Sequence, residues 1–364
     1  MMDPHELVKL SMCSYRLELF LRSSKRKIEH LHIHLNNKFY HVELVNGNAR
    51  FVTYFRNGEF EKPVITVKRM LQFCGSYESE SDKRLTFTQL FPLSLCFDVS
   101  HLLLSLYSCP LIGWVFYMDQ QDVETVRRYL DIILQGRCDK ITFFRSEMSS
   151  EFLTELMDKI PLDKKLRIES NIPSDFRHPN ALKFYVSQYK NGRWITLDDL
   201  KTIRNVLYVY LDSTNFNCHD INEFLHYWIN CDEKMFGQME LQLDNSVEID
   251  EDVLKDGLIT LRPEQQPDEF LSLYLKFKNP HIEQCDMCGL TILDNHNAIF
   301  YSWKSVRTPE VFEILDLLEK KKNLESENED SGTLEERKQE IAVKIEQLMY
   351  QLTKNSQSGY IFEI

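Results

Sequence analysis

The chain has 364 residues, of which 43% are hydrophobic, so it can bury the core of one large domain or of two ordinary ones. Its 43 Lys and Arg against 56 Asp and Glu give a net charge of −13, which argues against a general binder of nucleic acid or of anionic membranes. No apolar run approaches the roughly twenty residues that span a bilayer. The nine cysteines are scattered, as in a reducing compartment, so we expect a protein of the cytoplasm, the nucleus or both.

Residues 1–26 are predicted to form two short helices. Pro4 suits a first helical turn, Leu7 and Leu10 share a face, and Leu17 continues the apolar stripe in the second helix. From composition alone, this segment would be a small amphipathic cap on the sheet that follows.

An antiparallel β meander is predicted for residues 27–70. Apolar and polar side chains alternate there, as in strands with one buried face, and Asn46-Gly47-Asn48 is a strong turn signal. The last strand of the meander is predicted at 64–67. The polar segment 72–90, which contains SYESESDKR, is predicted to be a loop.

Four histidines lie in this meander. His30, His32 and His34 face one way along a strand, and His41 lies on the next strand. No Cys or carboxylate has a ligand spacing beside them, and the opposite face of the strand is apolar. A solvated outer face is therefore favoured over a metal site.

Strand and helix signals alternate from residue 91 to residue 305. Strands are predicted at 111–117, 140–144, 166–169, 181–186, 206–211 and 239–243, and helices at 122–134, 151–160 and 195–203. Successive strands start roughly 17 to 33 residues apart, which brackets the leucine-rich-repeat period of about 20–29 residues, although no asparagine position recurs regularly. We predict a mixed α/β fold for residues 91–305, an irregular leucine-rich-repeat-like curved β/α array with helices on its outer side.

The stretch from Trp194 to Asp244 shows this alternation most clearly. After the strand at 206–211, Asn217 is a predicted N-cap, and a helix follows that places Ile221, Phe224, Leu225 and Trp228 on one face. Strand, helix and strand within about forty residues predict a β-α-β unit with parallel strands.

The same stretch resembles the nematode-type F-box-associated domain, the second of two such families. The order W-x-T-L-D-D-L, a strand ending in Asp-Ser, and D-x-N-x-F-L-x-x-W-I carries the resemblance, through residues that include Trp194, Leu197, Asp199, Leu200, Phe224, Leu225 and Trp228. As the core of the family motif, these residues would pack the domain. Residues Met2 to Arg16 resemble the second half of a nematode F-box, whose first helix with its Leu-Pro pair would lie before Met1. We therefore expect an F-box that is truncated at its N-terminus.

This resemblance implies a substrate-recruiting adaptor of an SCF-type cullin–RING ubiquitin ligase. The F-box remnant would bind a Skp-type adaptor, and through it a cullin, by way of Pro4, Leu7, Leu10 and Leu17. The β/α domain would bind a protein target. The alternative is a protein-interaction scaffold that is uncoupled from the ligase because the F-box is incomplete.

The C-terminal third is predicted to begin with closing strands at 270–277 and 290–303, with a hairpin turn at 294–297. Between them, Cys285 and Cys288 form a C-x-x-C-G motif, with which zinc knuckles often begin, but a structural zinc site needs two further ligands and no second such pair follows. A loop with two incidental thiols is the other interpretation.

Residues 306–364 are predicted to form a helical cap or tail. Helices are predicted at 309–323 and 334–352, around a charged break at 325–332. Their apolar faces are too short for an independent coiled coil. A hairpin that caps the β/α array is therefore favoured over a partner-binding element.

Catalytic motifs are missing from the sequence. With 11 glycines, the chain has no Gly-rich nucleotide fingerprint, Walker loop, G-x-S-x-G or H-E-x-x-H motif. Asp198 and Asp199 are adjacent, but they open a helix, where carboxylates interact favourably with the helix dipole. We expect a non-catalytic protein without a cofactor.

Overall fold

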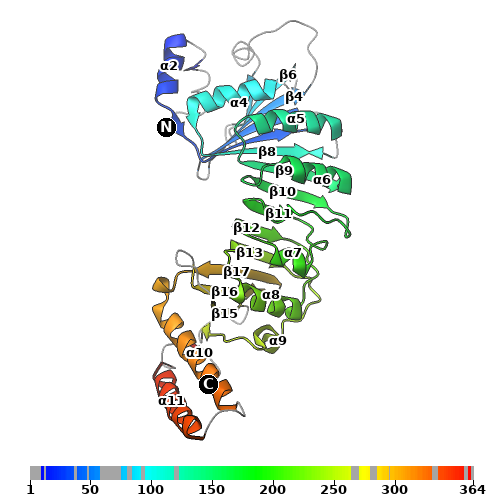
Figure 1. The fold of residues 1–364 in the computed structure, drawn as a ribbon. Coiled ribbons are helices and arrows are strands. Elements are labelled where there is room, and N and C mark those ends of the chain that lie inside the picture. The colour runs from blue at the N-terminus through cyan, green and yellow to red at the C-terminus, as the bar shows by residue number, and fades with distance from the viewer. Residues whose placement is uncertain are drawn as a thin grey trace. The chain divides into compact units, whose positions relative to one another are not determined.

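The computed structural model describes residues 10–11, 14–36, 39–46, 49–57, 75–79, 84–91, 95–118, 123–263, 270–278, 285–294, 296–329, 335–355 and 360–361. The predicted mixed α/β class is confirmed (Figure 1). The chain divides into two compact units, Met1–Asn171 and Ile172–Ile364. The division falls inside the segment 91–305, and the bounds of the predicted domains stay a prediction, as does the leucine-rich-repeat-like character.

The first unit contains a mixed sheet with the strand order β10-β9-β8-β2-β3-β4-β6-β5. Its strands are β2 (His30–Leu35), β3 (Phe39–Asn46), β4 (Ala49–Asn57), β5 (Gly75–Ser79), β6 (Arg84–Phe91), β8 (Leu111–Tyr117), β9 (Lys140–Glu147) and β10 (Lys165–Asn171). The antiparallel pairing of β2, β3 and β4 confirms the first three strands of the predicted meander. β8 joins β2 in parallel. The predicted strand 64–67 lies outside the described residues.

The prediction of a loop at 72–90 is wrong. The structure has two strands there, and β6 pairs in parallel with β4 and antiparallel with β5. In the sequence RLTFTQLF of β6, Leu85 and Phe87 alternate with threonines, a strand pattern that the polar residues before it concealed.

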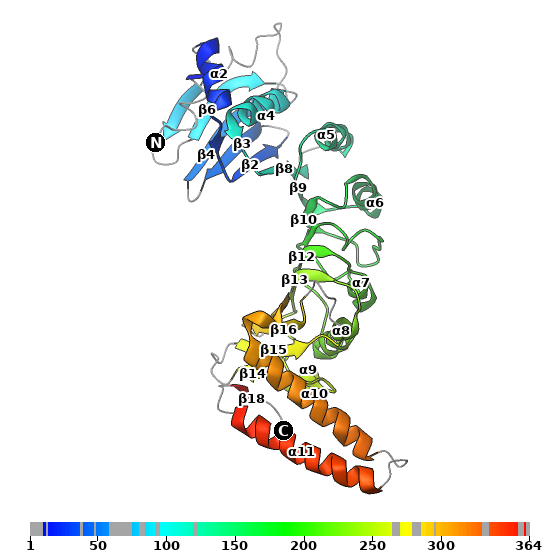
Figure 2. The same ribbon diagram turned by 60° about the vertical axis from the view of Figure 1, so that its left-hand side comes forward.

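Helices in the first unit are α2 (Tyr15–Ser23), α4 (Leu95–Leu106), α5 (Val123–Gln135) and α6 (Ser150–Lys159), and a small parallel pair joins β1 (Arg26–Lys27) to β7 (Tyr107–Ser108). α5 and α6 lie on the same side of β8, β9 and β10 (Figure 2). The predicted apolar face of α5 is buried at Val126, Leu130 and Ile133. Sequence reasoning missed α4, because its sequence LCFDVSHLLLSL has no clear polar face.

The second unit contains a sheet with the order β15-β16-β17-β13-β12-β11. Its strands are β11 (Val186–Tyr189), β12 (Val206–Leu211), β13 (Phe236–Gln242), β15 (Phe270–Lys276), β16 (Met287–Leu293) and β17 (Asn297–Trp303). β11, β12 and β13 are parallel, which confirms the predicted β-α-β unit. β17, β16 and β15 continue the sheet in antiparallel fashion. A second small pair joins β14 (Arg262–Pro263) to β18 (Tyr360–Ile361).

The strand predicted at 181–186 is misplaced, because the structure has turns at 179–183 and begins β11 at Val186. Ala181, Leu182 and Phe184 are nevertheless buried. An apolar run that is buried in turns gives the same sequence signal as a short strand.

Helices in the second unit are α7 (Leu197–Lys201), α8 (Cys218–Asn230), α9 (Glu251–Lys255), α10 (Pro309–Glu329) and α11 (Glu335–Asn355), with a short 3-10 turn, η2 (Ser305–Arg307). α10 and α11 form the predicted hairpin, which an ion pair between Arg337 and Glu327 joins. The predicted break at 325–332 begins too early, because α10 runs to Glu329. Glu and Lys are good helix formers, and Lys321 pairs with Glu325 one turn further on.

α8 and α10 pack on opposite faces of this sheet. Phe224 and Trp228 of α8 contact the ring of Phe300 in β17. α10 instead buries Leu315 in a cluster that contains Met287 of β16 together with Leu261, Val311, Ile314 and Leu318. Figure 2 shows α10 beside β15 and β16. Among the described residues, no helix is long and apolar enough to cross a membrane.

Candidate functional site

Two capping boxes fix the helices between β11 and β13. Thr196 Oγ1 accepts a hydrogen bond from Asp199 N, and Asp199 Oδ2 accepts one from Thr196 N, at 3.3 Å and 2.8 Å. Asn217 and Asp220 make the same reciprocal pair at the start of α8. These side chains satisfy backbone N–H groups that the first turn of a helix leaves without partners.

The apolar residues that carry the family resemblance pack on the side of the sheet that α8 covers. Trp194 is 1% exposed, its Nε1 donates to Asn191 O at 2.8 Å, and its ring meets Tyr189 edge to face. Phe224, Leu225 and Trp228 of α8 and Leu200 of α7 are buried, whereas Leu197 is partly exposed. The buried side chains cannot contact a partner protein without unfolding.

The opposite face of the same strands carries polar and aromatic side chains. Because side chains alternate along a strand, positions next to the buried Val209, Met239 and Phe300 point away from α8. They are partly exposed, and we name them the tyrosine face: Tyr208 and Tyr210 of β12, Gln238 and Glu240 of β13, and Ile299 and Tyr301 of β17. The register places Tyr208 beside Gln238 and Tyr210 beside Glu240.

Hydrogen bonds hold several side chains of the tyrosine face in place. Gln238 Nε2 donates to Glu240 Oε1 at 2.6 Å. Burial, and then the neighbouring Glu240 carboxylate, raise the pKa of Tyr208, so its hydroxyl stays protonated and can donate. Tyr301 stacks on Trp303, with ring centroids 5.3 Å apart, at the border with the cluster under α10. Such a surface offers aromatic area, one amide group and one carboxylate to a partner.

The predicted adaptor-binding residues are only partly described. Pro4 and Leu7 lie outside the described residues, Leu10 is partly exposed, and Leu17 is partly exposed in α2. The large exposed apolar side chains of α2 are Tyr15, Leu19 and Phe20, at 72%, 47% and 63%. The adaptor-binding role of the four residues stays a prediction.

Cys285 and Cys288 do not come together with further ligands in the described part of the chain. Cys288 is fully buried in β16, and burial raises the pKa of its thiol, whereas Cys285 is partly exposed. Among described residues, the group that can bring three metal-ligand atoms together is instead His32, His34 and Glu43.

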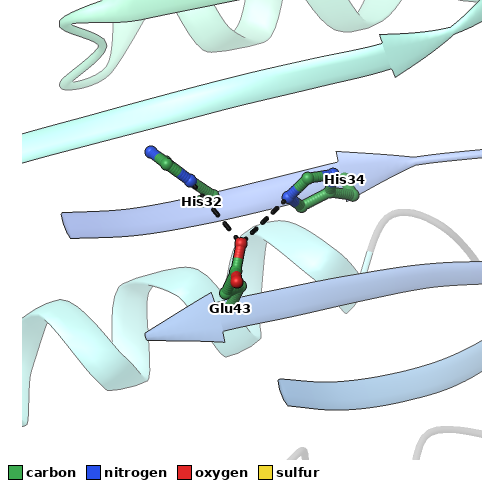
Figure 3. A group of neighbouring side chains, drawn as sticks. All are labelled: His32, His34 and Glu43. Carbon is green, nitrogen blue, oxygen red and sulfur yellow. Dashed lines mark ion pairs between the residues drawn. The ribbon is translucent and has the colours of Figure 1, made fainter. Parts of the chain in front are cut away.

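This group corrects the expectation that no carboxylate lies beside the histidines. The hairpin register pairs His32 of β2 directly with Glu43 of β3, and His34 with His41. Figure 3 shows the three side chains converging from the two strands. The sequence did contain the signal, since a tight connection between the strands at 30–35 and 39–46 predicts this pairing, but the histidines were compared only with one another.

The comparisons with known proteins bear on the second unit. Residues 174–240 match the model of a family described as F-box associated, which supports an F-box-associated domain in this part of the chain. The matched residues include β11, α7, β12, α8 and most of β13. The chain has no match among curated proteins and none among solved structures.

Proposed function

We propose that the chain recruits a protein target to an SCF-type cullin–RING ubiquitin ligase and catalyses no reaction itself. The observation that carries this proposal is the F-box-associated match at residues 174–240. Tyr208, Tyr210, Gln238 and Glu240 lie within the matched residues and on the tyrosine face. The matched segment therefore supplies both the buried core and a surface on which a target can bind.

The tyrosine face suits a protein target for physical reasons. Tyrosine rings bury a large area at a low cost in side-chain entropy, and their hydroxyls still form hydrogen bonds. Glu240 attracts basic side chains of a target. Bound there, a target lysine would be held near a ubiquitin-conjugating enzyme, which raises its effective concentration without any chemistry on this chain. The predicted leucine-rich-repeat-like arrangement, which the parallel strands β11, β12 and β13 with α8 on one face support, would present such a face.

We assign the contact with a Skp-type adaptor, and through it with a cullin, to the N-terminal segment. The resemblance of Met2 to Arg16 to part of an F-box supports this assignment. The exposed apolar side chains of α2 add to it, because F-box helices bind through apolar faces.

Co-purification tests the coupling to the ligase. The tagged chain should recover a Skp-type adaptor and a cullin, and the double variant Leu7→Asp, Leu10→Asp should lose both. Val306→Asp, which changes a side chain that is 80% exposed in the second unit, serves as the matched control and should retain them. If the unaltered chain recovers no adaptor, the ligase function fails and the uncoupled scaffold is the function that remains.

A second experiment tests the tyrosine face. Tyr208→Ala combined with Tyr210→Ala should retain the adaptor and the cullin but abolish the ubiquitination of proteins that depend on the unaltered chain, as measured by quantitative profiling of ubiquitinated peptides. Tyr185→Ala removes a tyrosine that is 43% exposed outside this face and should have no effect. An unchanged profile in the double variant would place the target elsewhere on the chain.

A further inference from the structure

We propose that His32, His34 and Glu43 form a binding site for a divalent transition metal ion of the Zn²⁺ type. The site lies in the first unit, outside the residues matched to the F-box-associated family. It is independent of the function proposed above.

The spacing of the ligand atoms fits one ion. Glu43 Oε2 is 3.6 Å from His32 Nδ1 and 3.5 Å from His34 Nε2, and the three ligand atoms all lie within 4.8 Å of one another. Ligands about 2.0 Å from a tetrahedral zinc ion are about 3.3 Å apart. Side-chain shifts of a few tenths of an ångström would therefore complete the coordination that Figure 3 outlines.

One nitrogen of the site is buried and has no hydrogen-bond partner. His34 Nε2 is inaccessible to solvent and makes no hydrogen bond of acceptable geometry. At 3.5 Å, the Glu43 oxygen is beyond the usual length of a charge-assisted hydrogen bond. Buried polar nitrogens are nearly always satisfied in folded proteins, and a metal ion between the imidazole and the carboxylate would satisfy this one.

The other nitrogen of His34 fixes the orientation of the ring. His34 Nδ1 lies 3.2 Å from the Tyr117 hydroxyl. In the neutral tautomer whose Nδ1–H donates to Tyr117, the lone pair of Nε2 points at the carboxylate of Glu43, so two electron-rich atoms face each other unless a proton or a metal ion lies between them. Metal-binding histidines commonly donate their second N–H to a neighbouring acceptor in this way.

The surroundings also leave room for the second histidine. Gly113 of β8 lies directly opposite His32, and a Cβ atom at this position would come within 2.8 Å of His32 Cδ2. Glycine in a strand interior weakens the strand and often marks a place where another group approaches closely. His41 supports the arrangement by stacking on His34, with ring centroids 4.0 Å apart.

The strands that carry the ligands are well anchored. β2 lies between β3 and β8, and on its other face Leu31, Ile33 and Leu35 are 0% exposed. Ligands on such strands are held in place before the ion arrives. Two imidazoles and one carboxylate favour Zn²⁺ and similar ions over Ca²⁺ or Mg²⁺, which prefer oxygen ligands, and three protein ligands leave a coordination position open to water.

Metal titration of the whole 364-residue chain, after it has been stripped with a chelator and dialysed, tests the site with the metal ion alone. Co²⁺ should bind with one-to-one stoichiometry and give visible absorption bands of a low-coordinate ion, and Zn²⁺ should displace it. His34→Asn and Glu43→Gln should each weaken binding by at least about 100-fold, because they remove a ligand. Gly113→Ala and Tyr117→Phe, which disturb only what surrounds the ligands, should weaken it by about 10-fold.

Two controls separate this site from other metal binding. His30→Asn changes a histidine on the same face of β2, outside the three-residue group, and should retain full affinity. Cys285→Ser with Cys288→Ser should also retain the Co²⁺ bands. Circular dichroism checks that each variant is folded, and Tyr117→Phe keeps the test valid if a ligand variant fails to fold. The proposal is overturned if the chain binds no Co²⁺, if the bands survive in His34→Asn, or if the cysteine variant abolishes them.

Discussion

At the scale of single residues, burial controls the chemistry of the thiols. Cys138 is 2% exposed, and burial raises its pKa to about 12. Burial also raises the pKa of Cys288 well above its usual value. A thiol that stays protonated at neutral pH is a poor nucleophile. Among the described residues Cys288 belongs to no group of three metal-ligand atoms, which leaves the imidazole and carboxylate group of the first unit as the better candidate.

The raised pKa of Cys138 predicts a stability change at alkaline pH. The unfolded chain loses this thiol proton near pH 9 and the folded chain only near pH 12, so the stabilisation is complete below pH 9 and is lost as the pH rises toward 12. Urea unfolding should be measured at pH 8 and at about pH 10.5. Between these pH values, the free energy of unfolding should fall less in Cys138→Val than in the unaltered chain. The difference should be up to about 1.4 kcal/mol for each pH unit above 9. Parallel losses in the two proteins would show that Cys138 ionises freely in the folded chain.

At the scale of secondary-structure elements, the cap of α8 is the local feature that the sequence predicted most directly. Asn217 Oδ1 accepts from His219 N at 2.8 Å, and Asp220 Oδ2 accepts from Asn217 N at 3.0 Å. Replacing Asn217 with Ala should lower the free energy of unfolding by about 1 kcal/mol. Asn245→Ala, at an exposed turn, should change it by less than about 0.5 kcal/mol. Equal effects in urea unfolding would argue against the cap.

A second prediction at this scale concerns α10. Leu315 is 1% exposed in the cluster between α10 and β16. If the helix is a structural cap, Leu315→Ala should lower stability by about 2–5 kcal/mol, because it leaves a cavity. Val343→Ala, at a site on α11 that is 54% exposed, should have little effect. Trp303 contacts the cluster, so tryptophan fluorescence can follow the urea transition. A small effect of Leu315→Ala would instead favour a helix that serves to bind a partner.

Elements with a regular period and a cap were predictable from sequence, and the others were not. α5, α6, α8 and β12 lie within a few residues of their predicted positions because each shows one apolar face or a defined start. α4 has no clear polar face, and the signal for β11 was displaced by buried turn residues. In these cases tertiary burial, and not local pattern, decides the structure.

The candidate sites depended on contacts that a linear pattern does not contain. His32 and Glu43 meet only through the register of β2 and β3. The tyrosine face can be predicted only when it is known on which side of β12 and β13 α8 packs. The apolar motif residues of the family, by contrast, were predictable as a core, because Ile221, Phe224, Leu225 and Trp228 follow the helical period.

At the scale of the whole molecule, the tyrosine face lies in a different unit from the other two features with assigned roles. α2 and the His32, His34 and Glu43 group belong to the first unit, and the tyrosine face belongs to the second. Variants in one group can therefore be compared with variants in the other as mutual controls. Metal binding should be unchanged in the double variant Tyr208→Ala, Tyr210→Ala. Conversely, the ubiquitination of targets should be unchanged in His34→Asn.

The net charge of the whole chain leads to the last prediction. A polyanion binds by exchanging its counterions for Lys and Arg, and this chain has 43 of these against 56 Asp and Glu. A local cluster of positive charge does exist, where Lys140 pairs in register with Lys165, next to Arg167. However, Arg167 forms an ion pair with Glu169, and burial, followed by the charges of Arg167 and Lys165, lowers the pKa of Lys140.

We therefore expect no binding of duplex DNA at physiological salt, as measured by fluorescence anisotropy with a labelled duplex. At low salt, where screening is weak, the repulsion by the acidic chain acts over a longer distance and should still prevent binding. Lys165→Glu should behave like the unaltered chain. Salt-dependent binding that Lys165→Glu abolishes would show that the local cluster outweighs the net charge, and nucleic acid would then have to be counted among the partners of this protein.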